Sequence, residues 1–154
     1  MTDIRFLDPK DWEEAISLTY RTFLEFDAPY FEEEGITQFR KFISDNALKR
    51  MFETNQFEVI GAYENDRLVG VIALRQINHI SLFFVDRDYQ NQGIGKKLIM
   101  SLIDYVSVKL KQSYITVNSS PYAEGFYHKI GFFDLDERIA KDGIIFTPMK
   151  YICR

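Results

Sequence analysis

Apolar residues recur along the chain with two spacings, one typical of helices and one typical of strands. Between residues 12 and 26 they return every three or four positions, which predicts one face of a helix that ends near Phe26. The same spacing predicts a second helix from Gly35 to about Met51 and further helices over residues 95–110 and 121–130. Short runs rich in branched and aromatic side chains predict strands at residues 4–6, 57–63, 68–75, 80–85 and 113–117.

Turn-forming residues separate these segments. Pro29 disfavours helix at the residue before it, so residues 27–34 are expected to connect the first two helices. Residues 64–67, which include Asn and Asp, predict a tight turn that joins two strands into a hairpin. Gly131 is expected to end the last helix in a left-handed conformation.

The order of these elements predicts an α/β fold with a mixed central sheet of about six to seven strands and about four helices. Residues 80–117 read as strand, long helix and strand, a unit whose size implies parallel pairing with a right-handed crossover. Asp142 and Gly143 predict a tight turn between two antiparallel strands, at residues 132–135 and 144–149. Because 154 residues are too few for two ordinary domains, residues 1–154 are expected to form one domain.

Composition and charge exclude several classes of function. The net charge of −4 makes a nucleic acid an unexpected partner. No run approaches the roughly 18 apolar residues that span a bilayer, and the polar N-terminus does not resemble a signal peptide, so we expect no membrane contact and a cytoplasmic protein. Cys153 is the only cysteine, and together with two histidines it is too little for a structural zinc site; we therefore predict no metal.

A polar turn that contains two glycines connects the strand at residues 80–85 to the long helix that follows. Gly93 and Gly95 let the backbone approach a ligand closely, and the first amides of a helix lack internal partners, so this turn is a candidate anion site. Lys96 follows immediately. The alternative is a tight turn without a ligand.

The sequence motif Gln90-x-x-Gly93-x-Gly95, between a strand and a long helix, resembles the signature of the GCN5-related N-acetyltransferases (GNAT). Residues 118–132 resemble the second acetyl-coenzyme A motif of that family, and the two motifs occur in the family's order. The resemblance covers about residues 57–150, with almost no motif in the N-terminal part. It implies the acetyltransferase fold, acetyl-CoA as the acetyl donor and no metal.

The resemblance also implies roles for individual residues. The turn would hold the pyrophosphate through backbone amides, the backbone of residues 83–85 would pair with the pantetheine arm, and Asn118 would bind that arm as well. Tyr127 occupies the position whose hydroxyl protonates the departing thiolate; the alternative is a tyrosine that only packs on its helix. The complete set of coenzyme-binding candidates is Phe83, Phe84, Val85, Gln90, Asn91, Gln92, Gly93, Ile94, Gly95, Lys96, Asn118 and Tyr127.

The acceptor side is less defined in the sequence. The connection between the first two helices supplies the substrate-binding candidates Glu25, Asp27, Tyr30 and Glu34. Its acidic character favours a cationic small molecule, although a peptide amine stays open. The general base is left open among Glu25, Asp27, Glu34, His79, Glu124 and a chain of water molecules.

These observations predict an N-acetyltransferase in which a primary amine attacks the thioester of acetyl-CoA directly, within a ternary complex. The alternative is a non-catalytic module on the same fold that binds acyl-CoA or a protein. Aromatic residues in the last strands would permit a homodimer.

Overall fold

Eight strands form the centre of the computed structural model, which describes residues 2–154. The strands are β1 (Thr2–Phe6), β2 (Glu58–Glu64), β3 (Arg67–Arg75), β4 (His79–Val85), β5 (Tyr114–Ser119), β6 (Phe133–Asp134), β7 (Ile139–Lys141) and β8 (Ile144–Ile152). They are ordered β1-β2-β3-β4-β5-β8-β6, and β7 pairs with β8 outside this order. Only β4 and β5 are parallel, so the predicted mixed sheet and the predicted parallel pairing are confirmed.

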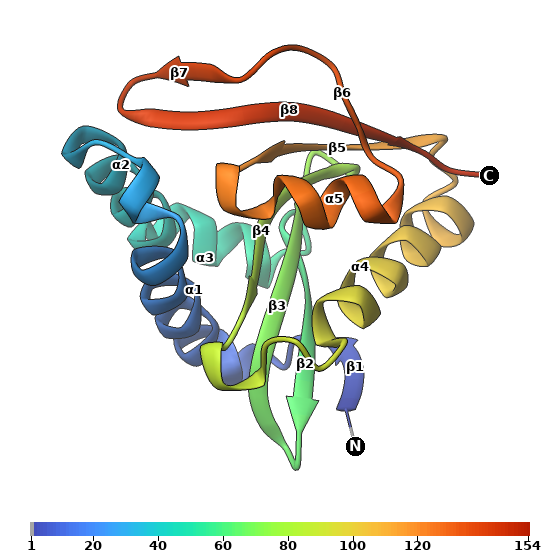
Figure 1. Cartoon of the computed structure of the whole chain (residues 1–154). Helices are drawn as coiled ribbons and strands as arrows, with labels where there is room; N and C mark the ends of the chain where they lie inside the picture. The colour runs from blue at the N-terminus through green and yellow to red at the C-terminus, as the bar shows by residue number, and fades with distance from the viewer. Residues whose placement is uncertain (1) are drawn as a thin grey trace.

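Helices cover both faces of this sheet (Figure 1). They are α1 (Trp12–Phe26), α2 (Glu33–Ser44), α3 (Asn46–Glu53), α4 (Ile94–Asp104) and α5 (Glu124–Ile130), and wider π-helical turns continue α4 over Tyr105–Lys109. Side chains that alternate along β3 divide between the two faces. Val71 and Ala73 belong to the core beneath α1, α2 and α3, whereas Ile72 and Leu74 belong to the core beneath α4 and α5.

The structure contains one helix and one strand more than predicted. The second predicted helix is two helices, because Asp45 adopts an extended backbone and its side chain caps α3 by accepting a hydrogen bond from the amide of Ala47. The C-terminal hairpin contains an extra strand, because β6 and β7 both pair with β8. The predicted turn at Asp142 and Gly143 is confirmed, with both residues at positive φ, and so is the left-handed stop at Gly131.

The sheet opens between β4 and β5. These strands pair only at His79 with Thr116 and at Ile80 with Val117. Opposite β3, Ala73 faces Leu82 and Leu74 faces Ile80, which leaves Ser81 as an extra residue in β4. A bulge of this kind bends a strand and ends regular pairing. Beyond Ile80, β4 therefore has a neighbouring strand on one side only.

The turn between β7 and β8 is fixed against the start of α2. The amide of Glu32 donates to the carbonyl of Gly143 over 2.8 Å. Gly35 lies so close to the same turn that a Cβ atom there would be 2.3 Å from the Gly143 carbonyl oxygen. This contact between distant parts of the sequence places α2 beside the start of β8 (Figure 1).

Candidate functional site

The opening between β4 and β5 leads into a cleft of about 760 Å³. Its walls come from α1 and α2 on one face of the sheet and from α5 and the turn before α4 on the other, with β4, β5 and β8 between them. All the predicted coenzyme-binding residues except Gln92 line this one cleft. Residues that are far apart in the sequence are thus brought together as the motif interpretation requires.

The turn before α4 has the properties of an anion site. Gly93 has a φ of +82°, a left-handed conformation that favours glycine, and Asn91 before it also has positive φ. The first helical bond runs from the amide of Lys97 to the carbonyl of Gly93. Among residues 2–154, no acceptor bonds the amides of residues 93–96, so these donors are free for the oxygens of a phosphate.

Gly95 contributes space rather than an unusual backbone. A Cβ atom at this position would make only ordinary contacts, the nearest at 3.5 Å from the ring of Phe126. The protein would therefore tolerate a small side chain at this position, which lines the cleft. The free amides, the positive charge of Lys96 and this open space fit a pyrophosphate group.

Gln90 uses its side chain within the protein. Its Nε2 donates to the carbonyl of Val85 over 3.0 Å, and its Oε1 accepts a hydrogen bond from the hydroxyl of Tyr122 over 3.0 Å. The side chain therefore ties the end of β4 to the segment that follows β5, across the mouth of the cleft. Gln92, which does not line the cleft, donates to the carbonyl of Asp88.

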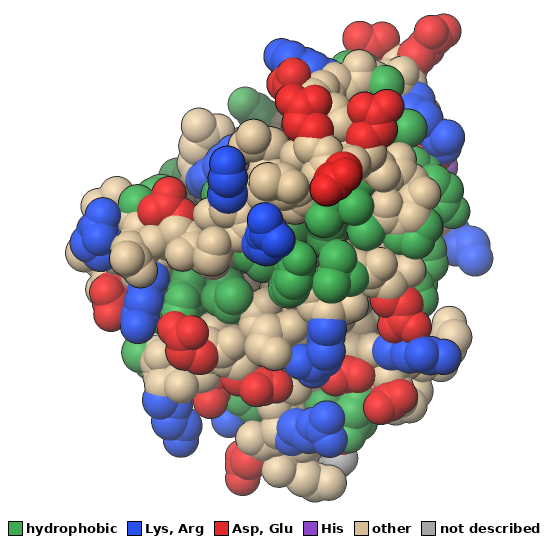
Figure 2. All heavy atoms as spheres, turned by 90° about the vertical axis from the view of Figure 1, so that its left-hand side faces the viewer, with side chains coloured by type: hydrophobic (Ala, Val, Ile, Leu, Met, Phe, Trp, Pro, Cys, Tyr) green, Lys and Arg blue, Asp and Glu red, His purple; other side chains and the backbone are tan. Residues whose placement is uncertain are grey.

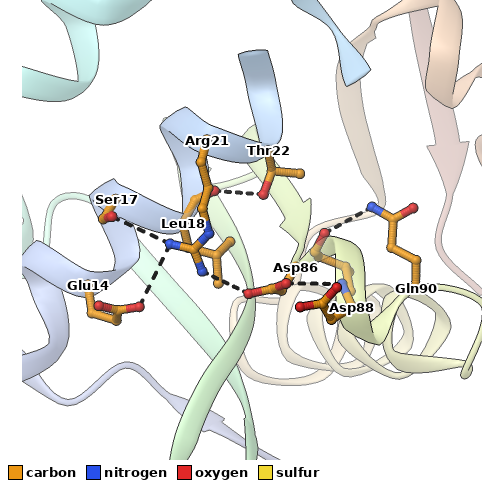
Figure 3. A network of polar contacts seen from close by, with 9 residues as sticks. Glu14, Ser17, Leu18, Arg21, Thr22, Asp86, Asp88 and Gln90 are labelled. Atoms are coloured by element: carbon orange, nitrogen blue, oxygen red, sulfur yellow. Dashed lines mark hydrogen bonds and ion pairs between the residues drawn. The ribbon is translucent and has the colours of Figure 1, made fainter. Parts of the chain in front are cut away.

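An ion pair anchors the end of β4 to α1 (Figure 3). Arg21 donates to the carboxylate of Asp86 over 2.8 Å, and the same carboxylate accepts a hydrogen bond from the amide of Asp88. Although burial acts in the opposite direction, the hydrogen bond from Arg21 and its positive charge hold the pKa of Asp86 below its ordinary value. Helix α1 and the end of β4 are thereby fixed relative to each other.

Tyr127 lies in an aromatic environment on the side of the cleft formed by α5 and the turn before α4. It exposes 3% of its surface, and its ring contacts the rings of Phe83, Phe126 and Phe132. Burial, and secondarily the negative charge of Asp27, raise the pKa of the phenol. The hydroxyl makes no hydrogen bond to any described residue, from 2 to 154, although Tyr127 lines the cleft. It is therefore a protonated donor at neutral pH.

Asp27 lies at the C-terminal end of α1 and also lines the cleft. Burial raises the pKa of its carboxyl group to about 6, while a hydrogen bond from the hydroxyl of Ser120 acts in the opposite direction. Burial, and secondarily the charge of Asp27, raise the pKa of both Tyr127 and Tyr122, which line the same cleft as Asp27. A carboxyl group with a pKa near neutrality in a cleft has the properties of a proton acceptor.

The other candidates for acceptor binding lie outside the lining of the cleft. Glu25 forms an ion pair with Arg87 over 2.8 Å at the surface. Tyr30 and Glu34 are exposed. Of the substrate-binding residues predicted from the sequence, the structure brings only Asp27 into the cleft.

Two further candidates for the general base have other partners. Glu124 accepts hydrogen bonds from Arg138 and Thr147 over 2.9 and 2.6 Å and does not line the cleft. His79 does line it, but its Nδ1 is bonded to the hydroxyl of Thr116 over 2.8 Å. Burial, and secondarily the charge of Arg75, lower the pKa of His79, which keeps the ring neutral.

Apart from Phe31, the sequence did not identify the wall of the cleft on the side of α1 and α2. This wall is aromatic and aliphatic, with the side chains of Phe23, Phe26, Phe31, Phe39, Phe42, Ile144, Ile145 and Phe146. Hydrophobic side chains are visible in the middle of this face of the molecule, with acidic side chains gathered above them (Figure 2). In the sequence these apolar residues have the same periodicity as core residues, so no local signal separates them from the core.

Arg75 is a second residue that the sequence did not identify. It lines the cleft, its guanidinium lies 5.5 Å from the centre of the Phe42 ring, and its Nε is buried without a partner among the described residues. Arginine at the end of a strand is common on protein surfaces, and only the fold shows that this one faces the cleft.

Neither a metal site nor a membrane segment is found in the part of the chain that the structure describes. In residues 2–154, no group of three or more His, Cys, Asp or Glu side chains is arranged to hold a metal ion. No helix formed by these residues combines the length and the apolar character needed to cross a membrane.

Comparison with known proteins gives a family and a fold. The pattern of the acetyltransferase (GNAT) domain family matches residues 27–153. No curated protein sequence matches the chain significantly.

Three solved structures illustrate the structural similarity. A GCN5-related N-acetyltransferase from Rhodopseudomonas palustris has a TM-score of 0.84 at 20% identity, over 99% of this chain and 96% of that chain. The PaiA N-acetyltransferase from Thermoplasma acidophilum, in complex with coenzyme A, has a TM-score of 0.81 at 21% identity, over 99% of both chains. A chimera of spermidine N-acetyltransferase from Vibrio cholerae has a TM-score of 0.70 at 16% identity, over 98% and 95%. At these identities the similarity shows the fold.

Proposed function

Because the chain belongs to the GNAT acetyltransferase family, we propose that it transfers the acetyl group of acetyl-CoA to a primary amine by direct attack within a ternary complex. The observation that carries this proposal is the juxtaposition of two features in one cleft. The free amides of residues 93–96 lie on the turn before α4, and Tyr127, whose ring contacts Phe83 in the unpaired part of β4, lines the same cleft.

Acetyl-CoA is the donor substrate in this proposal. The glycine turn and Lys96 would hold its pyrophosphate, and the edge of β4 from Phe83 to Val85 would pair with the pantetheine arm. Asn118, which lines the opposite wall, would also contact this arm. The complex of the Thermoplasma protein with coenzyme A supports this assignment by analogy of fold.

The chemistry requires a neutral amine near the thioester and a proton for the departing thiolate. Attack of the amine nitrogen on the carbonyl carbon forms the C–N bond, and the C–S bond then breaks. The raised pKa of Tyr127 keeps its phenol protonated, so its hydroxyl is suited to give a proton to the sulfur as the thiolate leaves. The attacking nitrogen carries two protons and the amide product keeps one of them. The other returns to the phenolate of Tyr127 and restores the phenol.

The rival function is a module that binds acyl-CoA or a protein without turnover. It lacks a specific supporting observation, whereas the free hydroxyl of Tyr127 in the cleft supports catalysis. We also propose a small-molecule or peptide amine as acceptor and a cytoplasmic location. Phe133 in β6 and Ile152 in β8 are exposed, which favours a homodimer, and light scattering tests this form.

Calorimetric titration with coenzyme A and acetyl-CoA tests the proposal. Wild-type protein is expected to bind both, and Gly95→Glu is expected to abolish binding because a carboxylate at the turn repels phosphate. Gly125→Glu is the matched control, since this helical position is exposed and a Cβ there meets nothing within 4 Å. Absence of binding in the folded wild-type protein would refute the proposed function.

A further inference from the structure

We propose that the acceptor is a singly charged primary amine on an apolar body the size of an aromatic ring, and that Asp27 accepts the proton of its ammonium group. This inference rests on the proposed N-acetyltransferase function and specifies its second substrate. It follows from the shape and the charges of the acceptor side of the cleft, meaning the part lined by α1, α2 and β8.

Aromatic rings that contact one another form much of the apolar wall on the acceptor side. Phe23 stacks on Phe39 with ring centres 4.0 Å apart, and Phe39 lies 6.0 Å from Phe84 of β4. At the other end of the wall Phe26 stacks on Tyr122 at 4.8 Å. These rings support one another, so the wall presents a preformed apolar surface that favours an apolar ligand over a hydrated one.

Asp27 is the one carboxylate that lines the cleft within residues 2–154. It follows Phe26 directly, and Phe26 stacks on Tyr122, so Asp27 lies where the apolar wall meets the segment after β5. Its charge acts on Tyr127, the proposed proton donor. An ammonium group beside Asp27 would therefore be close to the reacting thioester, while its apolar body would lie along the aromatic wall.

The remaining charges disfavour a polyamine. Glu32, Glu33 and Glu34 are exposed and do not line the cleft, so they offer no second carboxylate inside it. Arg75 lines the acceptor side and has no ion pair with another described residue, and it would repel a second ammonium group. His79 stays neutral. The cleft thus balances one positive charge on the ligand rather than two or more.

The proton transfer balances without further reagents. The amine enters as an ammonium ion, and Asp27 takes one proton, which leaves the neutral nucleophile. Attack then proceeds with the proton donation by Tyr127 described above, and Asp27 releases its proton to solvent. The pKa of Asp27, raised to about 6, is closer to the pKa of an alkylammonium group than that of an ordinary carboxyl group is. Burial in the cleft lowers the pKa of the ammonium group, which narrows the difference further.

A panel of amines tests the substrate class. Release of coenzyme A is measured with 2-phenylethylamine, with ethylamine, which lacks the apolar body, and with spermidine, which carries several charges. We expect kcat/KM to be at least about tenfold higher for 2-phenylethylamine than for either of the others. A preference for spermidine or equal rates for ethylamine would overturn this inference while leaving the proposed acetyl transfer intact.

The role of Asp27 has its own readout in the pH profile. The titratable groups that face it are Tyr127 and Tyr122, with Tyr30 and the Glu25–Arg87 pair on its own side. In the wild type, kcat/KM for 2-phenylethylamine should rise about tenfold per pH unit below pH 6 and then level off. Asp27→Asn should remove this dependence and most of the rate, with unchanged affinity for coenzyme A.

Glu33→Gln is the matched control, because it removes an exposed carboxylate from the same acidic segment, and its profile should equal that of the wild type. Calorimetric titration of 2-phenylethylamine into protein saturated with coenzyme A gives a readout that does not depend on turnover. If kcat/KM of Asp27→Asn still rose with pH below pH 6, the assignment of Asp27 as the proton acceptor would be refuted. Failure of the wild type to bind coenzyme A would refute the proposed function itself.

Discussion

The hydroxyl of Tyr127 is the group whose removal separates catalysis from packing. The ring is buried among Phe83, Phe126 and Phe132, whereas the hydroxyl bonds to none of the described residues 2–154. Tyr127→Phe should therefore preserve stability and the affinity for coenzyme A while lowering kcat by about 100-fold, a typical effect of losing a general acid. Steady-state kinetics and calorimetry on the same preparation measure both quantities. An unchanged kcat would mean that Tyr127 only packs on its helix.

The charge of Asp27, unlike the hydroxyl of Tyr127, is expected to affect the stability of the protein, because a buried charge is unfavourable for folding. Since burial raises its pKa to about 6 in the folded protein, the folded state binds the proton more tightly than the unfolded chain does. The contribution of this group to stability is therefore greatest at low pH and is lost as the pH rises from about 4 to about 6. At neutral pH the ionised Asp27 costs free energy.

Replacement of Asp27 by Asn should consequently stabilise the protein at pH 7. Allowing for partial exposure, the gain in the free energy of unfolding should be about 2 kcal/mol, and it should vanish toward pH 4. Denaturation curves at several pH values measure this difference, with Glu33→Gln as the control that should show none. A lower stability of Asp27→Asn at pH 7 would indicate a structural role instead.

How far single residues could be predicted depended on whether their role has a local signal. Gly93 and Gly95 lie in the turn that lines the cleft, and their spacing is a local signal because a phosphate turn needs small residues at fixed positions. The aromatic wall and Arg75 were not, because their role arises from contacts between α1, β3 and β8 that no short stretch of sequence encodes. Asp27 was one acidic candidate among several, and only burial distinguishes it from Glu25 and Glu34.

At the level of elements, the contact between α2 and the β7–β8 turn determines the shape of the acceptor side. A methyl group at Gly35 would lie 2.3 Å from the Gly143 carbonyl oxygen and 2.7 Å from a methyl of Ile144. Because two of its neighbours are backbone atoms, the clash cannot be relieved by rotating a side chain. Gly35→Ala should therefore push α2 away from β8 and cost about 1–3 kcal/mol of stability.

The same change should affect one substrate only. The KM for the amine should rise, because Gly35 and Ile144 line the acceptor side, whereas the affinity for coenzyme A should stay unchanged. Gly125→Ala is the control, as its Cβ meets nothing within 4 Å and it lies inside a helix, where alanine is favoured. Equal stability of Gly35→Ala and wild type would contradict this view of the contact.

The elements themselves were predicted mainly where periodicity was long. α1 and the strands of the β2–β3 hairpin agree closely with the sequence pattern, and the parallel β4–β5 pair followed from the length of the crossover. The break between α2 and α3 was missed because apolar positions continue with helical spacing through Asp45. A cap formed by one side chain can end a helix without disturbing that spacing.

At the scale of the whole molecule, the sheet consists of two halves joined by few backbone contacts. β1 to β4 form one half and β5 to β8 the other (Figure 1). Only two residue pairs connect β4 with β5. Side-chain bonds at Asn78 and His79 strengthen this junction at its closed end. At the open end, the exposed hydrogen bond from Tyr122 to Gln90 and the ring contacts of Phe83 with Phe126 and Tyr127 join the halves.

Coenzyme bound between the halves should therefore protect the open end most strongly. At a concentration about 100 times its Kd, the ligand stabilises the folded state by about 2.7 kcal/mol. Local openings that break the contacts with the ligand then become about 100-fold rarer. Amide hydrogen exchange should slow at residues 82–85, 93–96 and 118–119, whereas α3, outside the cleft, should change little. Gly95→Glu should show no such protection. Equal slowing in α3 would mean that the two halves already behave as one rigid unit, because the ligand would then suppress only global unfolding.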